Sequence, residues 1–154
     1  MNSRQGFKWT PVPGGAVSLC NKMTQDYLES LKIKQVYPGR LCTVFYEDMT
    51  TNPVKTFRKI YDFVGYQFNA AEQLRLTTMT ASKAEADPGN TYRHDSLKTA
   101  RAWRNQINTN VLTKTNKVCS KLYRLLGYPQ LKNLVELNNT NIPLRLAEKE
   151  INNP

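Results

Sequence analysis

Residues 41–65 constrain the fold of this chain more than any other stretch of its sequence. The run 41–46 is short and almost continuously apolar, a pattern typical of a strand that is covered on both faces. The Asn-Pro pair at 52–53 suits the start of a helix. Apolar residues then recur at helical spacing over 54–64, and Gly65 is suited to end that helix. The sequence therefore predicts an α/β fold with one central parallel strand.

The rest of the chain favours helices. An apolar face over 20–31 predicts a helix before the strand, and 70–76 predicts a short helix after it. Helical spacing resumes at Leu97 and continues to Gly127, with Ser96 as the expected N-cap. Between them, 77–95 is a long stretch with little periodicity, and loops of that length are usually functional or disordered. A single parallel strand needs neighbours, so the chain is interpreted as part of a larger domain.

Four short motifs occur in order along the chain. They are Pro-Gly-Arg at 38–40, Tyr-Glu-Asp at 46–48, Tyr-Arg-His-Asp-Ser at 92–96 followed by Ala-Trp-Arg at 102–104, and Leu-Gly-Tyr at 126–128. Together they resemble the sulfotransferase superfamily, and look most similar to the Golgi carbohydrate sulfotransferases that sulfate galactose or N-acetylglucosamine. The resemblance covers roughly residues 1–128. It implies the C-terminal part of a P-loop-like sulfotransferase domain, mostly helical here, with 129–154 as a polar, flexible tail.

The resemblance also implies a chemistry. The sulfate donor would be 3′-phosphoadenosine-5′-phosphosulfate, the acceptor a glycan hydroxyl, and no metal would take part. Tyr46 and Thr80 match residues beside the adenine of the donor. Ser3 matches a serine that holds the 3′-phosphate, and Arg93 offers the planar guanidinium that suits phosphate geometry. Ser96 belongs to the same segment as Arg93, and these five residues form the expected donor site.

The 154 residues contain no Gly/Ser-containing phosphosulfate loop of the kind that this family carries. The opening Met1–Arg4 resembles the end of a second family motif, whose arginine would lie upstream. We therefore interpret the chain as the C-terminal half of the domain, with no catalytic residue and no activity alone. Glu47 and Asp48 are expected to cap the next helix or tie the turn. One extra residue relative to the family pattern leaves His94 as an alternative to Arg93 at the aligned position.

Net charge leaves two other classes of function open. The chain carries a net charge of +10, and the excess lies on 1–128, because the charges after Pro129 balance. A basic surface suits an anionic partner, although it can also serve solubility alone. One alternative is thus a basic helical module that binds a glycan or RNA without catalysis, and another is a remnant of a cytosolic sulfotransferase acting on small phenols. No dense Lys/Arg run is present, which argues against nucleic acid.

Several features bear on the compartment. No apolar run approaches the roughly 18 residues that a membrane span requires. Golgi sulfotransferases are type II membrane proteins, so the resemblance implies a parent protein anchored in the Golgi membrane. Cys20 and Cys119 fall where the carbohydrate branch tends to have cysteines, which implies a lumenal disulfide. The alternative is that these two and Cys42 are small buried apolar residues. The sequon at 138–140 would be used only in a secretory compartment.

Overall fold

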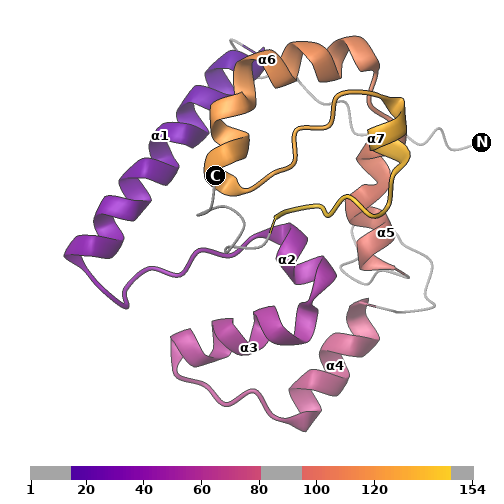
Figure 1. Cartoon of the computed structure of the whole chain (residues 1–154). Coiled ribbons are helices and arrows are strands. Elements are labelled where there is room, and N and C mark those ends of the chain that lie inside the picture. The colour runs from indigo at the N-terminus through magenta and orange to yellow at the C-terminus, as the bar shows by residue number, and fades with distance from the viewer. Residues whose placement is uncertain (1–14, 81–94, 147–154) are drawn as a thin grey trace, which may run out of the picture.

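The structure, a computed structural model, describes residues 15–80 and 95–146 (Figure 1). These residues are mostly helical, and no strand occurs among them. The helices are α1 (Gly15–Val36), α2 (Tyr46–Thr51), α3 (Pro53–Val64), α4 (Ala70–Thr80), α5 (Ser96–Arg101), the 3-10 helix η1 (Ala102–Asn105), α6 (Thr109–Leu126) and α7 (Leu134–Asn138).

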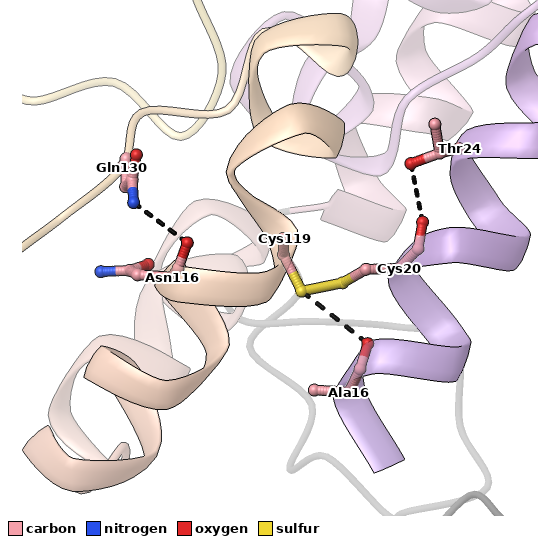
Figure 2. Close-up of a disulfide and its surroundings, with 6 residues drawn as sticks. All are labelled: Ala16, Cys20, Thr24, Asn116, Cys119 and Gln130. Atoms are coloured by element: carbon pink, nitrogen blue, oxygen red, sulfur yellow. Dashed lines mark hydrogen bonds between the residues drawn. A yellow bond between two sulfur atoms is a disulfide. The ribbon is translucent and has the colours of Figure 1, made fainter. Parts of the chain in front are cut away.

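The main core lies between α1 and α6, which run side by side (Figure 1). A disulfide joins Cys20 of α1 to Cys119 of α6, with 5.4 Å between their Cα atoms. Leu122 and Leu126 are buried in the same cluster. Figure 2 shows the sulfur bridge crossing directly between the two helices. The pairing that the family resemblance implied is thus present.

A second core cluster forms where the chain turns back after α6. Leu131 and Leu137 are each only 3% exposed, and both pack with the buried Leu112 of α6. Asn116 of α6 donates a buried hydrogen bond to the carbonyl of Leu131 at 2.6 Å. Residues 131 and 137 of the segment expected to be a flexible tail thus pack against α6, while the boundary of that tail stays a prediction. Of its apolar residues, Leu131 and Leu137 reach α6, whereas others in the segment stay exposed.

The expected central strand is not confirmed. Residues 41–45 have no regular secondary structure, although Phe45 has extended dihedrals (φ −107°, ψ 136°). Strand hydrogen bonds need a second extended segment alongside, and none occurs in 15–80 or 95–146. The apolar run is therefore an irregular connection between α1 and α2. Tyr46, expected to end the strand, instead begins α2.

Helix boundaries follow the local signals closely. Helix α3 begins at Pro53 and ends before Gly65, whose φ of +79° places it in the left-handed region, where glycine carries no steric penalty. Asp95, not Ser96, caps α5, because its carboxylate accepts a hydrogen bond from the amide of Lys98 at 2.8 Å. An aspartate is an equally good N-cap, and it comes one residue earlier.

Helices α3 and α4 pack against each other (Figure 1). No residue of α3 is fully buried, and in α4 only Leu76 is. Within the described ranges, no helix combines the length and apolar character needed to cross a bilayer.

Candidate functional site

The acidic turn expected after the strand is the first turn of α2, and it is tied to the end of α6. The hydroxyl of Tyr128 donates a hydrogen bond to the Glu47 carboxylate at 2.9 Å. Burial, and then the charge of Glu47, raises the pKa of Tyr128 well above its usual range, so this hydroxyl keeps its proton. Two motifs far apart in sequence, Tyr-Glu-Asp and Leu-Gly-Tyr, thus meet in one contact.

A second tie joins the same turn to the C-terminal segment. The Arg145 guanidinium bonds to the Asp48 carboxylate at 2.9 Å, and its Nε donates to the carbonyl of Leu126 at 2.8 Å. The guanidinium carbon also lies 3.6 Å from the centre of the Phe45 ring, within cation–π range. The Arg145 side chain is only 5% exposed. Both acidic side chains therefore serve to fix the turn, as the sequence predicted.

Arg104 anchors the segment that leads to Arg145. It is 4% exposed and donates to the backbone carbonyls of Asn139, Ile142 and Pro143 at 3.2, 3.1 and 2.9 Å. Burial and the nearby charge of Arg101 lower the pKa of Arg104. An arginine suits this place because its fork of donors can satisfy several carbonyls at once.

A cleft of about 620 Å³ lies beside this turn. It is lined by residues 43–45, by the start of α2, by α3 and by residues of the C-terminal segment within 140–146. Four cationic side chains line it: Lys55, Lys59, Arg101 and Arg145. The Nε of Arg101 is buried and has no hydrogen-bond partner among the described residues. Because the two acidic side chains in the cleft are already bonded, the arrangement favours an anionic ligand.

The predicted donor site is brought together only in part. The hydroxyl of Ser96 donates to the backbone carbonyl of Thr80 at 3.2 Å, which joins the end of α4 to the start of α5. Tyr46 is half exposed on α2, and α2 packs against α5. None of these three lines the cleft. Ser3 and Arg93 lie outside the described residues, so their roles stay predictions.

Sequence reasoning missed several residues of this region. Lys55 and Lys59 were assigned no role, and Arg145 lies in the segment expected to be flexible. The one available signal was spacing, since lysines four apart share a helix face. Nothing in the local sequence indicates that Arg104 is buried while its neighbour Trp103 stays 43% exposed.

Comparison with known proteins decides the family. The sulfotransferase domain matches residues 15–127. The chain belongs to the sulfotransferase family. Its similarity to carbohydrate sulfotransferase 2 of mouse and of human is 27% identity over 127 residues, covering 82% of this chain and 24% of each relative. Zebrafish carbohydrate sulfotransferase 1 is 26% identical over 125 residues, covering 77% of the chain and 30% of the relative.

This sulfotransferase-family chain thus spans about a quarter of the length of the carbohydrate sulfotransferase 2 proteins that it matches. No solved structure shows a significant match to it. The contacts around α2 extend beyond the matched domain. Glu47 and Asp48 lie within residues 15–127, whereas their partners Tyr128 and Arg145 follow residue 127.

Proposed function

We propose that this chain supplies the adenine and 3′-phosphate side of the donor site in a carbohydrate sulfotransferase. The whole protein would transfer sulfate from 3′-phosphoadenosine-5′-phosphosulfate to a glycan hydroxyl in the Golgi lumen. The observation that carries the proposal is the sulfotransferase-domain match over 15–127 together with relatives named as carbohydrate sulfotransferases. The Cys20–Cys119 disulfide supports a lumenal location, because disulfides persist in oxidising compartments.

The chemistry fits what these residues can do. Sulfuryl transfer, like phosphoryl transfer, depends mainly on positioning the two reactants and stabilising negative charge. In the proposal, Tyr46 and Thr80 contact the adenine. Arg93, Ser96 and Ser3 hold the 3′-phosphate through a guanidinium and two hydroxyl donors.

Calorimetric binding of 3′-phosphoadenosine-5′-phosphate to the 154-residue chain tests the proposal. Arg93→Ala should weaken binding by roughly ten- to a hundredfold, the usual range for a lost charge-assisted hydrogen bond. Arg75→Ala removes an exposed arginine of α4 and should leave binding unchanged. Adenosine 5′-phosphate, which lacks the 3′-phosphate, should bind about as weakly as the ligand binds to Arg93→Ala. Equal affinity for the two nucleotides would contradict the proposal.

Activity gives a second test. These 154 residues include no phosphosulfate loop, and each preorganised donor at such a site commonly contributes roughly a hundred- to a thousandfold in rate. We therefore expect this chain by itself to transfer no radiolabelled sulfate to galactose- or N-acetylglucosamine-bearing glycans. Turnover above the background without enzyme would place catalytic groups within these residues.

A second candidate function rests on the cationic cleft. Lys55, Lys59 and Arg101 would suit binding of an anionic polymer, such as a sulfated glycan, without catalysis. The double variant Lys55→Ala/Lys59→Ala separates the two functions. It should weaken retention on immobilised heparin if the polymer binds in the cleft, and it should leave nucleotide binding unchanged if the donor site lies at Tyr46, Thr80 and Arg93.

A further inference from the structure

The N-glycosylation sequon of this chain lies on its surface. Asn138-Asn139-Thr140 is the only Asn-x-Ser/Thr sequence with x other than proline in the 154 residues. Asn138 is the last residue of α7, and all three sequon residues are exposed. No hydrogen bond joins the Asn138 side chain to another described residue, whereas the side chains of Asn133 and Asn139 both accept one.

The backbone beyond Asn138 is fixed in a turn. Asn139 leaves the helix with φ −77° and ψ 102°. Its carbonyl accepts hydrogen bonds from Arg104 and from the amide of Ile142, and its side-chain oxygen accepts one from the amide of Asn141. The acceptor asparagine therefore stands at the end of a helix, next to a turn that is itself anchored to the core through Arg104.

An apolar pair lies on the same side of α7 as the acceptor. Leu134 and Val135 are 59% and 79% exposed. They precede Asn138 by four and three residues, the spacings that place side chains together on one helix face. Both are large apolar side chains left open to solvent beside the same acceptor. A glycan on Asn138 would extend across this pair, because sugar rings present apolar C–H faces.

The compartment supplies an independent argument. The Cys20–Cys119 disulfide is typical of proteins that fold in the secretory pathway, where asparagine glycosylation also occurs. The modification rests on the lumenal location in the proposed function, and it does not depend on sulfate transfer.

We propose that Asn138 carries an N-linked glycan that covers Leu134 and Val135. The co-reactant is an oligosaccharide carried on a polyisoprenyl pyrophosphate. The Nδ2 atom of Asn138 forms a bond to C1 of the first N-acetylglucosamine, the bond from C1 to the pyrophosphate oxygen breaks, and Nδ2 loses a proton as the lipid pyrophosphate leaves. The hydroxyl of Thr140 completes the recognition sequence.

The test is expression of the full chain behind a cleavable signal sequence in cultured mammalian cells, followed by gel mobility and peptide mass spectrometry. The wild-type chain should carry one glycan, which peptide N-glycosidase removes while converting Asn138 to aspartate. Asn138→Gln and Thr140→Ala should each abolish the glycan. The matched control Asn139→Gln keeps the sequon intact, and it should be glycosylated like the wild type.

A second sequon controls for entry into the lumen. Met23→Thr, at a 41% exposed position of α1, creates an acceptor sequence at Asn21. A glycan on Asn21 with none on Asn138 in the same molecule would overturn the proposal, since the chain would have met the transferase and left Asn138 unmodified. A failed sulfate-transfer or nucleotide-binding assay would leave this result unaffected.

Covering of the apolar pair has its own readout. Enzymatic removal of the glycan from the folded protein should increase binding of a hydrophobic fluorescent dye. In the double variant Leu134→Ser/Val135→Ser the same treatment should change dye binding much less. An equal increase in both proteins would show that the glycan does not cover these side chains.

Discussion

The α1–α6 pair and the first turn of α2 are both attached to the later part of the chain, but by different kinds of contact. The α1–α6 pair is joined by the Cys20–Cys119 disulfide and a buried apolar cluster. The α2 turn is joined by oriented polar contacts, from Tyr128 to Glu47 and from Arg145 to Asp48. One link is covalent and insensitive to charge, whereas the others depend on protonation and geometry.

This difference shows how a mostly helical chain can hold a polar turn in place. A disulfide acts mainly by restricting the unfolded chain, and it gives no orientation to side chains far from it. Oriented hydrogen bonds contribute less free energy each, but they fix direction. Phe45 connects the two regions, because it packs on the disulfide cluster and lies beneath the Arg145 guanidinium.

The largest effect is expected from loss of the disulfide. Replacing both Cys20 and Cys119 with serine removes a crosslink between residues 99 apart, which the chain-entropy model values at roughly 4–5 kcal/mol. Urea unfolding followed by circular dichroism should show a loss of that order. Cys42→Ser, which removes the free cysteine, is the control. A double variant no less stable than this control would mean that apolar packing alone holds α1 to α6.

The second-largest effect is expected at Arg104. Its replacement tests whether polar contacts contribute nearly as much stability as the disulfide. Arg104→Met keeps length but leaves the carbonyls of 139, 142 and 143 without these donors, at a cost of roughly 2–4 kcal/mol. Limited proteolysis should then cut within 139–146. Arg101→Met is the matched control, and it should be neutral or slightly stabilising, since the charge of Arg101 disfavours charged Arg104. If residues 139–146 stay protected from proteolysis in Arg104→Met, packing of the leucines in this segment is enough to hold it in place.

Tyr128 gives a smaller effect with a pH signature. Tyr128→Phe removes the hydrogen bond to Glu47 and should cost about 1–2 kcal/mol near neutral pH. The folded state raises the pKa of Tyr128 above its ordinary 10. The unfolded chain therefore loses this proton first, and stability should fall as pH rises through and beyond 10. Tyr123 contributes in the same direction, because burial raises its pKa too.

Unfolding midpoints measured at about pH 8 and pH 11 check this. The wild type should lose more stability between the two than Tyr128→Phe does. Tyr37→Phe, at a 60% exposed position, should keep the wild-type difference. If Tyr128→Phe also keeps it, the folded state does not raise the pKa of Tyr128.

The smallest effect belongs to an exposed ion pair on α1. Lys32 and Glu29 are 2.8 Å apart, with side chains 68% and 53% exposed. Such a pair contributes at most about 0.5 kcal/mol, so Lys32→Ala should change stability by no more than that, and added salt should reduce the change further. If Lys32→Ala lowers stability as much as Tyr128→Phe does, the exposed ion pair contributes as much as the partly buried hydrogen bond from Tyr128 to Glu47.

The sequence by itself determined much of the helical structure and the family. Pro53 and Gly65 bound α3 as expected, and Gly127 ends α6 in the left-handed conformation. Such signals are local, because a cap or a fixed φ acts within one turn of its own residue. The order of the four motifs likewise needs no tertiary contact, and it indicated the sulfotransferase family that the comparisons show.

Only the tertiary structure decided how these parts meet. Tyr128 bonds to a carboxylate 81 residues earlier, and Arg145 to one 97 residues earlier. Arg104 is buried beside an exposed Trp103, against the usual ranking of residue types. Periodicity says which face of an element is apolar, but it does not say which distant group will cover it. The same reason explains why the sequence of 41–45 was not enough to predict a strand. A strand forms only where a neighbouring segment pairs with it.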